Sequence, residues 1–271
     1  MPTWKKLLPI AGISILLVGS CVAIYYAISL SSYDGPGTTN NLEQIILERC
    51  SMYREKNQSI RHEDCIQIWQ ALTKAATSKD PCSVTQEDYA PLLELTDQKA
   101  VCNKVLLWSK TKQIAHCLTK ENQQYITLED TFLGFLFDDL TWCGRAHKEG
   151  FNFTSCPTWK KCVNNTITSF WKMASASFAR NACGLVTIML NGSAANGIVD
   201  YNSILWTVEI PHLNPLKVSE VQLWLIDDRD LCSSEPVLKL RKYIEQKGLK
   251  YSCSEYYRPE ELERCIKEHV L

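Results

Sequence analysis

The chain has 271 residues, of which 45% are hydrophobic and 22% are charged, and this composition excludes an intrinsically disordered protein. Its 29 basic and 30 acidic side chains almost cancel, so no excess of positive charge is present to neutralise a phosphate backbone, and we expect no nucleic-acid binding. The thirteen cysteines are the unusual part of the composition.

An apolar segment over residues 7–30 contains no charged side chain and is long enough to cross a bilayer as one helix. Lys5 and Lys6 precede it, so the positive-inside rule predicts a cytoplasmic tail of residues 1–6. A cleaved signal peptide is the alternative, but its apolar region normally has about 7 to 15 residues. We therefore predict one transmembrane helix and a single-pass type II protein of the plasma membrane, with its remaining chain extracellular.

The cysteine count supports export. Cys21 lies in the apolar segment and leaves twelve cysteines outside it, an even number that is typical of disulfide-bonded proteins in an oxidising compartment. Four N-glycosylation motifs agree with this location, at Asn57, Asn152, Asn164 and Asn191. We expect no metal site, because the sequence contains neither a C-x-x-C nor an H-E-x-x-H motif.

The first part of the exported chain has helical patterns. Residues 31–41 are polar and rich in turn-forming residues, and are predicted as a stalk. Apolar residues at helical spacing predict a helix over residues 42–56. Residues 66–75 and 101–117 are predicted as further helices or buried segments, and residues 166–183 as an amphipathic helix.

A clear helix start lies at Thr127, which precedes Asp130 by three residues in a variant of the capping box. The predicted helix covers residues 127–142 and places Glu129 on an apolar face, where its carboxylate is expected to be partly desolvated. Alternatively, Glu129 and Asp130 only complement the helix dipole.

The second part of the chain changes to short runs rich in β-branched and aromatic residues, which indicate strands of a parallel sheet, buried on both faces. The predicted strands are residues 184–190, 205–210, 221–226 and 249–252, and the predicted helices between and after them are 236–246 and 259–268. Glu209 is the one charged residue in its predicted strand, which makes it a candidate for a functional site. The alternative is that it lies exposed at the end of an edge strand. The fold class is α/β, close to α+β, with helices first and alternating strands and helices afterwards.

Common catalytic motifs are missing. The sequence has no G-x-S-x-G, no P-loop, and no G-x-G-x-x-G after a strand, which disfavours serine hydrolases, kinases and dinucleotide-binding domains. Trp108 and Trp171 stand beside polar residues, although packing in a core is the usual role of a tryptophan.

Several segments together resemble the ADP-ribosyl cyclase family, over essentially all of the exported chain. They are GPGTT (35–39), CNKVLLWSK (102–110), TLEDT (127–131), DDLTWCG (138–144), SFWK (169–172), MLNGS (189–193) and Val208–Glu209. The resemblance implies a disulfide-rich protein in which a helical domain packs on a domain with a short, mainly parallel sheet, with a cleft between them. The helical domain takes residues 42–101 and 127–182, and the α/β domain takes residues 102–126 and 183–271.

The resemblance also implies an activity: cleavage of the bond between nicotinamide and ribose in NAD, giving mostly ADP-ribose with some cyclic ADP-ribose, and hydrolysis of the cyclic product. NAD and NADP are then substrates, and no cofactor is expected. Glu209 matches the catalytic glutamate, and Trp171 is expected to stack on nicotinamide. Glu129 is expected to bind the carboxamide and to influence whether water or adenine captures the ribose. The other expected substrate-binding residues are Trp108, Ser109, Lys110, Asp130, Asp138, Ser175, Ser203 and Ile204.

The phosphate site departs from the family pattern, in which arginine often replaces Lys110 and a hydroxyl residue replaces Ile204. Five disulfides are implied by the resemblance: Cys50–Cys65, Cys82–Cys162, Cys102–Cys183, Cys143–Cys156 and Cys232–Cys253. Cys117 is extra and Cys265 has lost its usual partner, so the two are expected to be free, to pair with each other, or to bridge two chains. A homodimer and a protein ligand at the cell surface stay open, as does the alternative that the exported part is a receptor or adhesion protein with a vestigial cleft.

Overall fold

The computed structural model describes residues 33–270 except 61, 63, 78, 97–101, 122, 147, 192–197 and 227–230. The predicted tail and membrane segment lie outside the described residues. Among the residues described, none of the helices has the length and apolar character needed to cross a bilayer.

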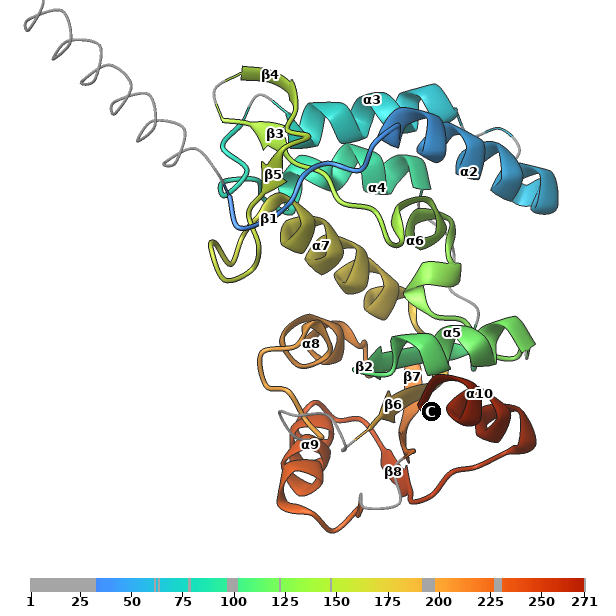
Figure 1. The fold of residues 1–271 in the computed structure, drawn as a ribbon. Helices are drawn as coiled ribbons and strands as arrows, with labels where there is room; N and C mark the ends of the chain where they lie inside the picture. The colour runs from blue at the N-terminus through green and yellow to red at the C-terminus, as the bar shows by residue number, and fades with distance from the viewer. Residues whose placement is uncertain are drawn as a thin grey trace, which may run out of the picture.

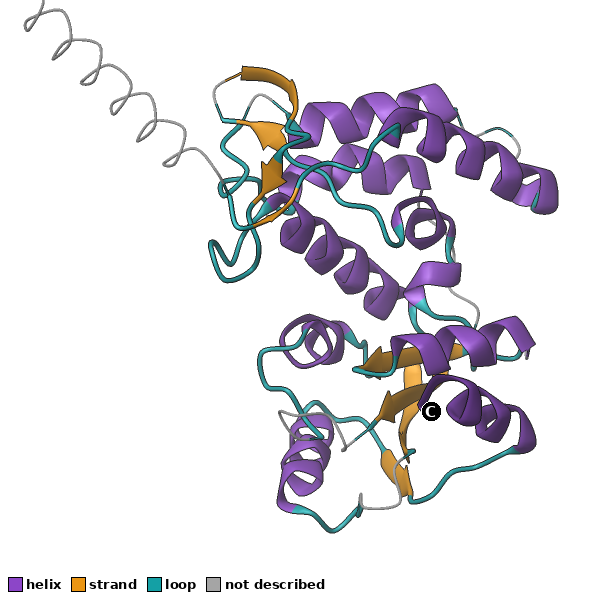
Figure 2. Ribbon diagram, viewed as in Figure 1, coloured by secondary structure: helices purple, strands orange, loops and turns teal. Residues whose placement is uncertain are grey.

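The described chain has a helical half and a half with a sheet (Figures 1 and 2). The helical half contains α2 (Leu42–Lys56), α3 (Cys65–Ala76), α4 (Ala90–Thr96), α6 (Phe132–Phe137) and α7 (Thr166–Asn181), with the single turns η1 (Gln58–Ile60), η2 (Glu87–Tyr89) and η3 (Leu128–Asp130). Two small antiparallel pairs lie beside these helices: β1 (Gly35–Pro36) with β5 (Ser155–Cys156), and β3 (Gly144–Arg145) with β4 (Lys148–Phe151). The domain boundaries given above remain a prediction.

The second half is built on a four-stranded parallel sheet in the order β2-β6-β7-β8. The strands are β2 (Val105–Ser109), β6 (Gly184–Leu190), β7 (Val218–Leu225) and β8 (Tyr251–Ser254). The helices of this half are α5 (Lys112–Glu121), η4 (Leu205–Glu209), α8 (Ile210–His212), α9 (Glu235–Gln246) and α10 (Glu260–Val270).

Both faces of the sheet are buried, because side chains alternate along each strand. Leu106, Met189 and Trp224 pack with the apolar residues of α5 and α10 on one face. Ile188 and Leu223, which are paired in register, belong to the main core on the other face. This confirms the predicted parallel sheet with strands buried on both faces.

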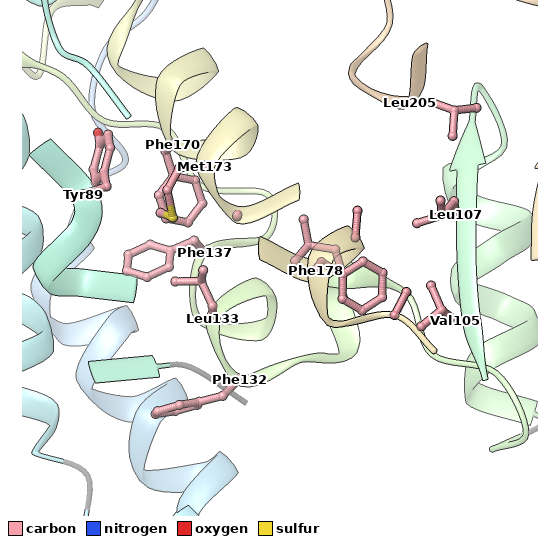
Figure 3. Close-up of a cluster of buried hydrophobic side chains, with 14 of the residues drawn as sticks. Tyr89, Val105, Leu107, Phe132, Leu133, Phe137, Phe170, Met173, Phe178 and Leu205 are labelled. Atoms are coloured by element: carbon pink, nitrogen blue, oxygen red, sulfur yellow. The ribbon is translucent and has the colours of Figure 1, made fainter. Parts of the chain in front are cut away.

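The main core continues from the helical half into the sheet (Figure 3). Tyr89 and Phe170 lie on the helical side, Leu107 lies on β2, and Phe178 of α7 lies between them. The indole of the buried Trp142 donates a hydrogen bond to the Tyr89 hydroxyl, with 3.1 Å between nitrogen and oxygen. Because one apolar cluster joins the two halves, a cavity between them has firm walls on both sides.

Most predicted elements are found, including the helices over 42–56, 66–75 and 166–183. The predicted helix over 127–142 is wrong in its extent: it is divided into η3 and the short α6. Thr131 ends η3 and caps α6, since its hydroxyl accepts a hydrogen bond from the Gly134 N–H at 3.1 Å. Residues 101–117 contain a strand followed by the start of a helix, and the last strand is shifted to 251–254.

The predicted strand over 205–210 is also wrong, because these residues form a π-helical turn followed by α8. The Ile210 N–H bonds to the Leu205 carbonyl five residues earlier. Pro211 follows directly; it has no N–H, and in an ordinary helix its ring would press on the carbonyl four residues before it. A widened turn is compatible with both restrictions, and such turns are frequent at functional sites.

All five disulfides expected from the resemblance are present, and the sixth joins Cys117 to Cys265. Of the three options for these two cysteines, the structure therefore has them paired with each other. This bond connects α5 to α10 within the smaller core cluster.

Candidate active site

A cavity of about 570 Å³ lies where the sheet half meets the helical half. It is bounded by the end of β2, the η3 turn, the residues after α6, one side of α7, and the segment that ends in η4. Ten predicted site residues line it: Trp108, Ser109, Lys110, Glu129, Asp138, Trp171, Ser175, Ser203, Ile204 and Glu209. Residues from five separate segments of the sequence are thus brought to one site.

Glu209 is the buried acid of the cavity. Its residue is 8% exposed, and its carboxylate accepts a hydrogen bond from the Ser175 hydroxyl at 3.0 Å. Burial raises the pKa of Glu209 to about 8, and the nearby charge of Glu129 acts in the same direction, while the bond from Ser175 opposes it. The alternative of an exposed acid on an edge strand is therefore wrong.

Glu129 is fixed by the fold of the η3 turn. The Asp130 carboxylate accepts hydrogen bonds from the Thr127 N–H and hydroxyl at 2.7 and 2.9 Å, which confirms the predicted capping box. Gly134 of α6 packs directly on the turn: a Cβ atom at this position would lie 1.9 Å from the Leu128 carbonyl oxygen. Any larger residue at 134 would displace the turn that carries Glu129.

Two neighbours hold the Glu129 carboxylate. The Trp108 indole donates a hydrogen bond to Oε2 at 3.3 Å, and His116 Nε2 lies 3.5 Å from the same oxygen as an ion pair without hydrogen-bond geometry. Burial acts to raise the pKa of Glu129, but His116 and Trp108 outweigh it and hold that pKa below its usual value. Of the two glutamates that line the cavity, Glu129 is thus ionised at neutral pH, whereas Glu209 is largely protonated when no cation is bound.

Trp108 and Trp171 supply the aromatic surfaces of the cavity, and both are half-buried. Trp108 comes from β2, and Trp171 from α7, where its ring meets Phe170 of the core edge to face at 5.0 Å. An indole held rigidly by core packing offers a fixed face to a planar, positively charged ring.

Basic side chains lie at another part of the cavity. Lys110 follows β2 with a backbone φ of 62°, and its ammonium lies 4.0 Å from an Asp200 carboxylate oxygen. Lys112 donates hydrogen bonds to Asp138 and Asp139 at 2.7 and 2.6 Å, so its single positive charge is shared between two acids at the cavity wall. Of the carboxylate contacts described for these two lysines, that of Lys110 with Asp200 is the longer.

The end of α6 is held from outside the cavity. Arg49 of α2 donates hydrogen bonds to the carbonyl groups of Phe135, Leu136 and Asp138 at 3.3, 3.2 and 2.7 Å. These carbonyls lack partners within the helix because the helix ends here. Arg49 thus fixes the backbone from which Asp138 reaches Lys112.

One predicted site residue does not belong to the cavity. Asp130 is not among the residues that line it; its carboxylate caps η3 and also accepts a hydrogen bond from the Thr119 hydroxyl at 3.3 Å. Conversely, sequence reasoning missed His116, Lys112 and Asp139. These residues are identified only by their contacts with other segments in the folded structure, because no motif in the sequence contains them.

The four N-glycosylation motifs differ in their exposure. Asn164 is exposed, whereas Asn57, Asn152 and Asn191 are half-buried, and glycosylation of all four stays a prediction. Within the described part of the chain, Cys117, Glu268 and His269 form a group at metal-binding distances, but the Cys117 sulfur is bonded to Cys265 and so cannot act as a thiolate ligand.

Comparisons with known proteins agree with one another. The family model described as ADP-ribosyl cyclase matches residues 39–270. Mouse ADP-ribosyl cyclase/cyclic ADP-ribose hydrolase 1 is 39% identical over 259 residues, which cover 93% of this chain and 85% of the mouse protein.

Two solved structures are similar to this chain over most of its length. Porcine CD38, in complex with a covalent intermediate, ribo-F-ribose-5'-phosphate, has a TM-score of 0.77 and 40% identity, with 82% of this chain and 99% of the porcine chain covered. Aplysia cyclase, in complex with the substrate NGD and the product cGDPR, has a TM-score of 0.76 and 30% identity, with 86% of this chain and 96% of the Aplysia chain covered.

Proposed function

The chain belongs to the ADP-ribosyl cyclase family, and we propose on this basis that it is an enzyme that cleaves NAD. It breaks the bond between nicotinamide and ribose, releases ADP-ribose with some cyclic ADP-ribose, and hydrolyses the cyclic product. NAD and NADP are substrates, and the reaction needs no cofactor. The observation that carries the proposal is a buried carboxylate, Glu209, in a cavity lined by two tryptophans.

The reaction suits a site with few catalytic groups. The nicotinamide ring of NAD is positively charged and leaves as a neutral pyridine, so no acid has to protonate the leaving group. One carboxylate at the sugar is therefore the minimum requirement. Ionised Glu209 stabilises the developing positive charge on C1′ of the ribose, as an ion pair or as an ester. The covalent intermediate in porcine CD38 supports the ester.

The other lining residues take roles that follow from their chemistry. Trp171 stacks on the nicotinamide ring, and Trp108 forms the other aromatic wall. The Glu129 carboxylate accepts a hydrogen bond from the carboxamide and affects which nucleophile captures C1′. The diphosphate is held by Lys110 and by polar groups of Ser109 and Ser203.

The pH dependence of the rate follows from the raised pKa of Glu209. In the free enzyme this carboxyl group is protonated below about pH 8, so kcat/KM for NAD should rise with pH and level off above about pH 8. In the complex the positive nicotinamide ring favours the carboxylate, so kcat should level off at lower pH. Initial rates between about pH 6 and about pH 9 test this, and a flat kcat/KM over that range would contradict it.

Binding of the diphosphate can be tested at Lys110. Its ammonium group carries a positive charge but cannot donate the two parallel hydrogen bonds of an arginine guanidinium. Lys110→Arg should lower KM for NAD about threefold or more, with little change in kcat, because the gain is in binding the diphosphate. Lys74→Arg, an exposed change on α3, is the control. Equal KM values for Lys110→Arg and the unaltered protein would show that the lysine does not limit binding.

The activity itself is tested with the fluorescent substrate etheno-NAD and the purified full chain. Cleavage should raise the fluorescence, Glu209→Gln should abolish the rise, and the exposed change Glu55→Gln should leave it intact. Chromatography of the products then gives the ratio of cyclic to linear ADP-ribose. If the unaltered chain gives no rise, the proposal fails, and the second candidate, a receptor or adhesion protein with a vestigial cleft, is favoured.

We also propose that the enzyme is a single-pass type II protein of the plasma membrane with its catalytic part outside the cell. The six disulfides support an oxidising compartment. The apolar residues 7–30 are the proposed membrane anchor, with residues 1–6 in the cytosol. A homodimer and a cell-surface protein ligand remain candidate partners.

A further inference from the structure

His116 of α5 stands directly behind the Glu129 side of the active site. Its Nε2 lies 3.5 Å from Glu129 Oε2, and its Nδ1 lies 3.9 Å from Asp138 Oδ2. Its ring meets the Trp108 indole edge to face, with 6.2 Å between ring centres. Trp108 in turn donates a hydrogen bond to the same oxygen of Glu129 that faces His116.

His116 lies next to a residue of the active site but does not itself face the bound substrate. His116 is not among the residues that line the active-site cavity, whereas Trp108, Glu129 and Asp138 are. Its side chain is 19% exposed and reaches a second pocket of about 430 Å³ on the same helix. A proton can therefore reach His116 from solvent without passing through bound substrate.

We propose that His116 is a positioning residue: when protonated, it holds the Glu129 carboxylate in place and thereby favours capture of the ribose by water over capture by adenine. This inference rests on the proposed function and adds to it a residue that controls the product ratio.

The chemistry explains why the position of Glu129 matters more for one product. In hydrolysis the water oxygen bonds to C1′, the link from C1′ to Glu209 is released, and the proton of the water must pass to an acceptor. In cyclisation the ring nitrogen of adenine bonds to C1′ and releases the same link, with no proton transfer at that moment. A carboxylate held near the attacking water therefore accelerates hydrolysis selectively.

The charge of His116 depends on the groups that surround it. These are Glu129 on η3, Asp138 and Asp139 after α6, Lys112 and Lys120 on its own helix, and Glu268 and His269 on α10. Burial acts to lower the pKa of His116, but Glu129 and Asp138 outweigh it and raise that pKa above its ordinary value. Protonated His116 is thus present at acidic and near-neutral pH and is lost as the pH rises further.

The test measures the initial ratio of cyclic to linear product from NAD, using the purified full chain. In the unaltered protein the ratio should rise about fivefold from about pH 6 to about pH 9. His116→Ala should show the high ratio at both pH values. His116→Gln keeps an N–H donor without a titratable charge, so its ratio should be lower than in His116→Ala and independent of pH. His62→Gln, an exposed change, should follow the unaltered protein.

A second arm separates positioning from a general effect on the fold. In a Glu129→Gln background, His116→Ala should cause no further change in the ratio, because the group it positions is gone. Additive changes would overturn the inference, as would a His116→Ala ratio equal to that of the unaltered protein at about pH 6. Absence of NAD cleavage by the unaltered chain would instead overturn the proposed function.

Discussion

Replacing Glu209 by glutamine should lower kcat for NAD cleavage about a thousandfold or more and should also make the protein more stable at alkaline pH. The loss of activity follows because glutamine can neither bond to C1′ nor balance its positive charge, and groups with such roles account for losses of this size. Steady-state rates on NAD at about pH 8 measure this effect.

The gain in stability follows from the raised pKa of the buried carboxyl group. A carboxyl group whose pKa is raised on folding contributes stability that is fully present below its unfolded-state pKa and is lost as the pH rises through about 8. At about pH 9 the folded protein holds an ionised carboxylate in a buried position, at a cost on the order of 4 kcal/mol. Glutamine still accepts the hydrogen bond from Ser175 and carries no charge.

Thermal unfolding at several pH values checks this part of the prediction. For a chain of this length we expect Glu209→Gln to raise the melting temperature by roughly 5 to 10 °C at about pH 9 and by much less at about pH 5. Glu55→Gln should shift it by no more than about 1 °C at either pH. A melting temperature for Glu209→Gln that is unchanged or lower at alkaline pH would mean that burial does not destabilise the ionised acid.

Loss of activity together with a gain in stability would identify Glu209 as a residue retained for the reaction rather than for the fold. An acid without a cationic partner in an apolar site is unfavourable until a positively charged substrate arrives, and the Ser175 hydroxyl only partly offsets its burial. The positive nicotinamide ring supplies the missing charge, so binding of NAD and ionisation of Glu209 favour each other.

Sequence periodicity predicts the elements whose burial follows one simple pattern. The helix over 42–56 buries one stripe, and the strands over 184–190 and 221–226 bury both faces, so local pattern and final structure agree. Residues 205–210 have the composition of a strand, yet they form a helix, because Pro211 and packing against the core decide their conformation. In the helical turn Leu205 and Glu209 are both buried, whereas Thr207 is exposed.

The active site is less predictable than the fold because its contacts join distant segments. His116 and Glu129 belong to different elements, so no spacing motif relates them. Asp130 matches the family pattern as well as Glu129 does, but its carboxylate is directed to the cap of η3 and to Thr119. Only the three-dimensional arrangement separates the acid of the cavity from the acid of the turn.

Removal of the Cys117–Cys265 disulfide, by changing both residues to serine, should have the largest effect on stability. The bond closes a loop with a sequence separation of 148 residues, for which chain entropy predicts a loss of about 5 kcal/mol. Cys265 is buried in the core cluster between α5 and α10, so serine there also loses apolar contact. We expect thermal unfolding to show a melting temperature lower by about 10 °C or more.

The matched control is the double change of Cys232 and Cys253 to serine. That bond closes a sequence separation of 21 residues, both cysteines are half-buried, and the predicted loss is smaller, about 3 kcal/mol. Because α5 also carries Lys112 and His116, loss of the Cys117–Cys265 bond should shift the product ratio toward cyclic ADP-ribose, whereas the control should not. Equal melting temperatures for the two double variants, together with equal product ratios, would show that α10 does not support the wall of the active site.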